Sequence, residues 1–209
     1  AFMALEHPAV REAVNGLAER GVPAVTLISD IANARRAAYV GLDNRSTGRT
    51  AGYLVARFIG KRPAKVAMIA GSLSYRAHEE REMGFLHLFE ELFPQIEVVG
   101  LREGLDDEGR NYRQAKALLA QHPDLAGIYN IGAGNRGIAR ALEESGRARE
   151  VVYICHEVTE FTRRFLVSGT VDAVIDQNPR VEARDAVDWL LMAAQGQHQP
   201  NLPPIRIQA

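Results

Sequence analysis

The chain has 209 residues, enough for one or two domains with a buried core, and its formal net charge is −1. A balance so close to neutral gives no electrostatic reason to expect nucleic-acid binding by this segment. The single cysteine, Cys155, excludes an internal disulfide and a cysteine-rich metal site, and the six histidines are too scattered to suggest a metal cage. We recognise no apolar run near the roughly 18 residues of a membrane span and no secretory-signal pattern.

Helix and strand patterns alternate along the whole chain, which opens without methionine inside the apolar run AFMAL, typical of the end of a strand. We therefore expect a longer protein that continues upstream. Apolar spacing predicts helices at 8–20, after Asn44, after Gly71, at 110–121, after the segment 132–137, at 157–167 and at 181–194. Short apolar runs predict strands at 23–28, 39–42, 65–70, 96–101, 126–131, 151–155, 171–175 and 205–207. Such alternation favours an α/β fold with parallel sheets covered on both faces, in one wide sheet or in two smaller ones.

Two of these helices have apolar faces that we expect to be buried. In the helix after Gly71 the face comprises Phe85, Leu88, Phe89 and Leu92. In the last helix it comprises Val187, Leu190, Leu191 and Ala194.

The stretch Gly71–Phe85 (GSLSYRAHEEREMGF) follows a predicted buried strand and carries the most suggestive polar groups. Ligands of α/β proteins bind at the carboxyl ends of strands, and a guanidinium such as that of Arg81 suits a polyhydroxylated ligand. Ser72 lies close by, and Tyr75 offers a flat apolar face for a sugar ring. The alternative is that Arg81 is a solvated surface charge, because the run around it is charged throughout.

Residues 132–137, GAGNRG, match the dinucleotide-binding fingerprint, and Glu157 lies about 20 positions further on, as that motif requires. Alone, this pattern indicates an NAD-dependent oxidoreductase. However, the motif stands late in the chain, whereas the usual position is the first strand–helix turn. We favour a tight turn at the carboxyl edge of a sheet that faces a ligand.

Other polar clusters also follow predicted strands. His156-Glu157 can bond sugar hydroxyls, while Glu157 can instead cap or charge the next helix. Asp176-Gln177-Asn178-Pro179 and Asp43-Asn44 each allow a ligand contact or a plain helix start.

Catalytic motifs are not found: the sequence has no HExxH, GxSxG or P-loop pattern. Cys155 precedes His156, but neighbouring residues of a strand point to opposite faces, so the two are unlikely partners in nucleophilic catalysis. We expect Cys155 to be a small core residue.

Taken together, the motifs resemble the effector-binding domains of lactose-repressor-type transcription regulators, which are close kin of periplasmic sugar-binding proteins. The resemblance covers essentially the whole chain and is strongest over 40–85 and 171–187. It is carried by GVPAVTLISD, YVGLDNRSTGRTAGYL, VAMIAGSLSYRAHEEREMGF with its Arg–x–x–Gly–Phe ending, GIARALEESG and VDAVIDQNPRVEARDAV.

The resemblance implies two α/β lobes of periplasmic-binding-protein type I, joined by three crossovers, with the ligand between them. Residues 1–43 and 178–200 would form an incomplete N-terminal lobe, and residues 46–175 and 204–209 the C-terminal lobe. The crossovers would fall near Asp43-Asn44, Asp176-Gln177 and Pro203-Pro204. The DNA-binding headpiece would be absent from this chain.

The resemblance also implies a set of ligand contacts. Arg81 matches the arginine that bonds sugar hydroxyls, Asp43 a carboxylate at the first crossover, and Gln177 a glutamine at the next. His156 or Glu157 stands where the family usually has Asp, within YICHE. Asn130 and Asn135 are alternatives for an Asn-Asp pair that this chain lacks.

The function implied is a non-catalytic sensor without cofactor or metal, which binds a small carbohydrate and thereby changes the affinity of a cytoplasmic homodimer for operator DNA. The alternative is a periplasmic sugar-binding protein of an ABC transporter. A second alternative is the NAD-dependent oxidoreductase that GAGNRG suggests.

Overall fold

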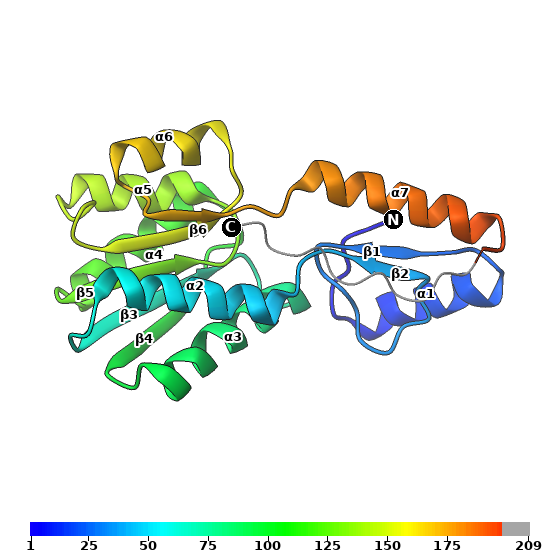
Figure 1. Ribbon diagram of the computed structural model, residues 1–209, viewed down its shortest axis with the longest axis horizontal. Coiled ribbons are helices and arrows are strands. Elements are labelled where there is room, and N and C mark those ends of the chain that lie inside the picture. The colour runs from blue at the N-terminus through cyan, green and yellow to red at the C-terminus, as the bar shows by residue number, and fades with distance from the viewer. Residues whose placement is uncertain (198–209) are drawn as a thin grey trace. The chain divides into compact units, whose positions relative to one another are not determined.

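The computed structural model describes residues 1–197, which form two compact units (Figure 1). The first unit contains residues 1–43, 74–79 and 177–197, and the second contains residues 44–73 and 80–176. The chain thus passes between the units at 43/44, 73/74, 79/80 and 176/177.

The second unit is built on one parallel sheet of five strands. The strands are β3 (Ala64–Ala70), β4 (Ile96–Glu103), β5 (Leu125–Asn130), β6 (Val152–His156) and β7 (Ala173–Ile175). Their order in the sheet is β4-β3-β5-β6-β7, and every neighbouring pair is parallel. In this doubly wound order the connections reverse direction beside β3, so the carboxyl ends of β3 and β5 flank the switch point where such sheets bind ligands.

Helices cover both faces of this sheet (Figure 1). They are α2 (Asn44–Ile59), α3 (Arg76–Leu92), α4 (Glu108–Gln121), α5 (Asn135–Glu144) and α6 (Glu160–Ser168). Two of them begin at side-chain caps of the expected kind. The carboxylate of Asp107 accepts the Arg110 amide at 2.7 Å, and Thr159 and Thr162 cap the start of α6 reciprocally.

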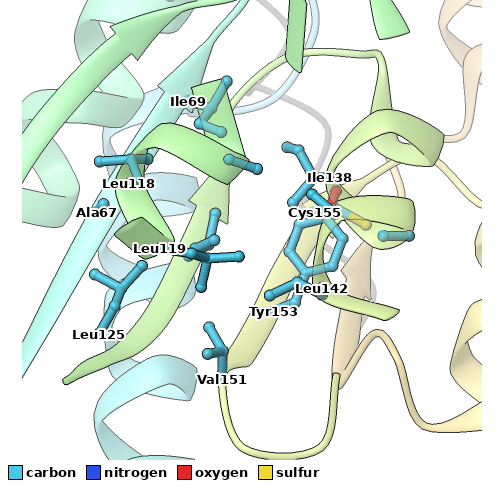
Figure 2. Close-up of a cluster of buried hydrophobic side chains, with 14 of the residues drawn as sticks. Ala67, Ile69, Leu118, Leu119, Leu125, Ile138, Leu142, Val151, Tyr153 and Cys155 are labelled. Atoms are coloured by element: carbon cyan, nitrogen blue, oxygen red, sulfur yellow. The ribbon is translucent and has the colours of Figure 1, made fainter. Parts of the chain in front are cut away.

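The main core of the second unit lies between the sheet and α4 and α5. Alternate residues of β3, such as Ala67 and Ile69, point into it, as the two-residue period of a strand requires. Figure 2 shows Ile138 and Leu142 of α5 beside Tyr153 and Cys155 of β6 in this cluster. Cys155 is fully buried here, which confirms the prediction that it is a core residue. On the other side of the sheet, Gly127 leaves room for the side chains of α2.

The first unit contains α1 (Pro8–Glu19), β1 (Val25–Leu27), β2 (Ala38–Val40) and α7 (Pro179–Ala194). The two strands are parallel, and Phe2 forms an isolated parallel bridge to Thr26 of β1. Trp189 and Ala186 of α7 pack on both strands and close a small core.

The prediction of an α/β fold with parallel sheets is confirmed. The predicted buried face of α7 is wrong for Val187 and Leu191, which are 54% and 56% exposed, and for Ala194, whereas Leu190 packs partly buried against the core. The buried residues are Glu182, Ala186 and Trp189. The bulky indole of Trp189 packs against β1 and β2 and so determines which face of α7 is buried, and the spacing of apolar residues alone did not indicate this. Leu92 is likewise 57% exposed at the end of α3, although Phe85, Leu88 and Phe89 are buried as predicted.

One predicted domain boundary differs from the structure, and several predicted C-terminal features lie outside the described residues. Residues 74–79 group with the first unit, although we expected them in the lobe formed by residues 46–175. The predicted strand 205–207, the Pro203-Pro204 crossover and the lobe segment 204–209 lie outside the described residues. Across residues 1–197, no helix is long and apolar enough to cross a membrane.

Candidate functional site

Six of the predicted site residues lie at the carboxyl edge of the five-stranded sheet or on the helices that follow it. Ser72 comes after β3, Asn130 ends β5, His156 ends β6, and Glu157 follows it. Arg81 lies in the second turn of α3, and Asn135 is the first residue of α5. Because the carboxyl ends of parallel strands meet at one edge, residues distant in sequence gather there.

Hydrogen bonds to Asn44 and to the Ile131 carbonyl help to hold Arg81 inside the second unit. Its Nε donates to Oδ1 of Asn44 at 2.8 Å, and its Nη1 donates to the carbonyl oxygen of Ile131 at 3.0 Å. The residue is only 2% exposed, so the alternative of a solvated surface charge does not fit. The partners come from the start of α2 and the end of β5, and they fix the guanidinium beside the switch point of the sheet.

Two glycines allow α2 and α3 to approach closely enough for these bonds. A Cβ added to Gly48 of α2 would overlap the backbone carbonyl of Arg81. A Cβ added to Gly84 of α3 would overlap the carbonyl of Arg45. Each glycine thus lies against the backbone of the opposite helix. The Arg–x–x–Gly–Phe motif therefore carries both the guanidinium and the small residue that brings it to Asn44.

Buried aromatic rings lie on the same elements, α3 and β5, that carry Arg81 and precede its partner Ile131. Phe85 of α3 stacks on Tyr129 of β5 with ring centroids 5.0 Å apart. The Tyr129 hydroxyl is 2.8 Å from Nε2 of His156, and both residues are buried. Burial raises the pKa of Tyr129 well above its ordinary value, so the phenol stays neutral and keeps its proton near pH 7.

Asn130 and Asn135 belong to one internal network. Nδ2 of Asn130 donates to Oδ1 of Asn135 at 2.6 Å and to the Ala133 carbonyl at 2.9 Å. Nδ2 of Asn135 donates to the His156 carbonyl at 3.0 Å, and the Tyr153 hydroxyl donates to Oδ1 of Asn135 at 2.9 Å. These bonds tie the ends of β5 and β6 to the start of α5, and a direct ligand contact by either amide stays a prediction.

The glycines of GAGNRG have structural explanations within this unit. Gly134 adopts φ 76° at the N-cap of α5, a left-handed conformation that favours glycine. A Cβ on Gly137 would overlap the carbonyl of Glu108 in α4, and a Cβ on Gly132 would overlap the carboxylate of Asp106. The glycine spacing that resembles a dinucleotide fingerprint is therefore accounted for by close contacts with α4 and the loop before it.

Glu157 adopts φ 70°, which is uncommon for a residue with a side chain. Its amide donates to the carbonyl of Ile175 in β7 at 3.1 Å, and its carbonyl accepts the Thr162 hydroxyl at 2.7 Å. The backbone of Glu157 thus joins β6, β7 and α6. Thr159, rather than Glu157, is the N-cap of α6.

The remaining predicted contacts belong to the first unit. Asp43 is exposed and ends its first segment, while Gln177 is buried and begins its last. Tyr75 lies in segment 74–79 and meets the ring of His78 edge-on, with centroids 5.7 Å apart. The structure thus brings six predicted residues to one sheet edge and places these three in the other unit.

Sequence reasoning missed the groups that hold Arg81 in place. Asn44 was noted only as part of a helix start or ligand contact, and the Ile131 carbonyl is a backbone group with no residue-type preference. Tyr129 was assigned to a strand without a role. In the sequence, only the polar pair Asp43-Asn44 before a helix indicated that Asn44 could have a role at the site.

A doubly wound parallel sheet with polar groups and a buried arginine at its carboxyl edge is the architecture of a domain that binds small molecules. The model of the periplasmic binding protein domain family matches residues 1–198, and the chain belongs to that family. A comparison with curated proteins found no match to this sequence.

Several solved structures are similar over most of the chain. One is GanP, a glucose-galactose binding protein from Geobacillus stearothermophilus, with 26% identity, a TM-score of 0.90, and coverage of 97% of this chain and 72% of that one. Another is an ABC transporter solute-binding protein from Burkholderia graminis C4D1M in complex with D-arabinose, with 25% identity, a TM-score of 0.87, and coverage of 96% and 69%. The first is thus a protein that binds glucose and galactose, and the second is a solute-binding protein in complex with a sugar.

A solute-binding protein from Agrobacterium vitis with bound D-fucose has a TM-score of 0.87 over 94% of this chain and 68% of its own. At 22% identity it supports the fold alone. The comparisons thus support the periplasmic-binding-protein-like fold, and they leave the lactose-repressor-type identity a prediction.

Proposed function

We propose that this chain binds a small sugar and serves as the sugar-binding protein of an ABC-type transporter. The observation that carries the proposal is the buried guanidinium of Arg81, held by Asn44 and the Ile131 carbonyl beside the switch point of the sheet. The similarity to a glucose-galactose binding protein and to a D-arabinose complex supports the same ligand class.

The chemistry of the edge suits a neutral polyhydroxylated ring. A guanidinium presents several N–H donors in a fixed plane, a geometry that suits the hydroxyl oxygens of a sugar ring. Because Asn44 and Ile131 fix its plane before the ligand arrives, little side-chain entropy is lost on binding. His156 adds an imidazole that can donate or accept a hydrogen bond. Asp43, Tyr75 and Gln177 of the first unit are proposed as further ligand contacts, as are Ser72 and Glu157 of the second.

The test is isothermal titration calorimetry of the 209-residue chain with D-glucose, D-galactose, D-arabinose and D-fucose. We expect saturable binding of at least one of them, with the others weaker because hydroxyl stereochemistry is read by hydrogen bonds. Circular dichroism establishes that the chain is folded. A folded chain that binds none of these sugars would contradict the proposal.

A second candidate is the sensing core of a lactose-repressor-type regulator, favoured by the order of the motifs from YVGLDNRSTGRTAGYL to VDAVIDQNPRVEARDAV. It uses the same sugar site, so sugar binding does not separate the two. The resemblance to such a regulator predicts a homodimer that acts on operator DNA, whereas the transporter proposal requires no dimer. Light scattering after gel filtration, with and without the preferred sugar, separates them: a stable dimer favours the regulator, and a monomer the transporter protein.

The oxidoreductase suggested by GAGNRG is tested with the same sample. Titration with NADH, followed by its fluorescence, is expected to show no saturable binding, since packing contacts already account for the glycines. Tight cofactor binding would overturn the sugar-binding proposal in favour of an enzyme.

A further inference from the structure

The loop that joins β4 to α4 carries a carboxylate that lies against the two loops beside the switch point. Asp106 accepts the backbone amide of Ala133, which follows β5, at 2.7 Å. A Cβ added to Gly71, which follows β3, or to Gly132 would overlap the Asp106 carboxylate. The carboxylate therefore occupies a notch that exists only because both positions are glycine.

The backbones around this notch are also joined directly. The Leu105 amide donates to the Gly71 carbonyl at 2.8 Å, and the Ile131 amide donates to the Ile69 carbonyl at 2.7 Å. A Cβ on Gly132 would stand 2.8 Å from the amide nitrogen of Gly71. Contacts around Asp106 thus join the loops that follow β3, β4 and β5.

The backbone of the β4–α4 loop is strained at Asp106 and at the residue before it. Leu105 and Asp106 adopt φ values of 53° and 57°, in the left-handed region that residues with side chains avoid. Two successive residues in this region persist only where surrounding contacts hold them, and such strain is concentrated at functional sites. Here the contacts that hold them are those to Gly71 and Ala133.

We propose that Asp106 is a positioning residue for ligand binding, which fixes the Ile131 carbonyl and, through it, the guanidinium of Arg81. The inference rests on the proposed sugar-binding function. Asp106 bonds Ala133, two residues after Ile131, and Ile131 accepts the hydrogen bond from Arg81 at 3.0 Å. Without the carboxylate the loop after β5 loses this anchor, and the Ile131 carbonyl that accepts a hydrogen bond from the guanidinium is held less firmly.

Three variants and one control test this role. Asp106→Gly removes the carboxylate but suits the left-handed backbone, so the loop itself has no reason to misfold. Asp106→Asn keeps the acceptor oxygen and removes the charge. Asp106→Glu keeps the charge but moves it by one methylene out of the notch. The control is Asp107→Ala, which removes one negative charge from the same loop and the N-cap of α4.

Calorimetry with the preferred sugar of the four-sugar panel gives the dissociation constants. We expect D106G and D106E to bind on the order of tenfold more weakly than D107A, the effect of about one lost hydrogen bond, while D106N stays close to the unmodified chain. Affinity of D106G and D106E within twofold of D107A, or a D106N variant as weak as D106G, would overturn the positioning role.

Amide hydrogen exchange separates this inference from the proposed function, because it needs no ligand. In D106G and D106E we expect faster exchange at residues 70–73 and 131–134 than in D107A, with the remaining strands unchanged. If the unmodified chain binds no sugar, the proposed function fails while faster exchange still supports the anchor. Unchanged exchange at these residues contradicts the anchor, whatever the chain binds.

Discussion

The Nε of Arg81 donates a hydrogen bond to Oδ1 of Asn44 at 2.8 Å, and both residues are buried. The two are 37 positions apart, on different helices. A buried charge without hydrogen-bond partners is costly, so Asn44 contributes to folding as well as to the orientation of the guanidinium.

Asn44→Ala tests this relationship. Removing the acceptor leaves a buried cationic N–H unsatisfied, so we expect the free energy of unfolding to fall by roughly 1.5–3 kcal/mol. Chemical denaturation followed by circular dichroism measures it. Asn44→Asp keeps an oxygen acceptor in the same place and is the matched control. Equal stability of N44A and the unmodified chain would show that the bond contributes nothing.

Gly48→Ala tests the close approach of α2 and α3. The added Cβ would overlap the backbone carbonyl of Arg81, which cannot move without moving α3. We expect a loss of roughly 1–3 kcal/mol of stability from overpacking, together with weaker sugar binding. Gly16→Ala in α1 is the control, because a Cβ there meets nothing within 4 Å. That variant is expected to gain about 0.5–1 kcal/mol from helix propensity. An equal change in the free energy of unfolding for G48A and G16A would contradict the close approach of α2 and α3.

The Asp30–Arg36 ion pair of the first unit predicts a dependence of stability on pH. Burial alone would raise the pKa of Asp30, but hydrogen bonds from Arg36 and Thr26 hold it below its ordinary value of 3.8. The ionised Asp30 therefore contributes its full stabilisation at pH values above 3.8. This stabilisation is lost as the pH falls through the lower pKa that Asp30 has in the folded state. We expect the free energy of unfolding, measured by chemical denaturation, to fall less between pH 7 and pH 3 for Asp30→Asn than for the unmodified chain. An equal fall in both would exclude a role for this carboxyl group.

Cys155 is predicted to be unreactive in the folded protein. Burial raises the pKa of its thiol to about 12, and the side chain is 0% exposed, so almost no accessible thiolate exists at pH 8. A thiol reagent with a chromogenic leaving group should label the chain promptly in denaturant and very slowly without it. Labelling at the same rate in both conditions would contradict the position of Cys155 in the core.

Much of the fold could be predicted because apolar periodicity is a local property of the sequence. The runs around Val66 and Ile128 indicate buried strands, and these alternate with helices in the observed order. Val187 and Leu191 of α7 were predicted to be buried because they lie four residues apart; Ala186 and Trp189 lie three apart, and either spacing places two residues on one face of a helix. Only the contact with β1 and β2 decides which set is buried.

The candidate site could be predicted in part. The Arg–x–x–Gly–Phe motif pointed to Arg81, but its burial could not be predicted because the neighbouring residues are charged. Its partners lie 37 and 50 positions away, and one of them is a backbone carbonyl. The segment GAGNRG was misleading in the opposite way. Its glycine spacing fits a known motif, but close contacts with α4 and Asp106 explain why these positions are glycine.

The most direct measurement is the dissociation constant of the preferred sugar for Arg81→Lys. Lysine keeps the charge but lacks the planar donors that bond Asn44, Ile131 and a ring hydroxyl together. Arg164→Lys on α6, where the side chain is 70% exposed, is the matched control. We predict that R81K binds at least roughly tenfold more weakly than the unmodified chain and that R164K binds equally well. Unchanged affinity in a folded R81K variant would contradict the assignment of the sugar site to this edge of the sheet.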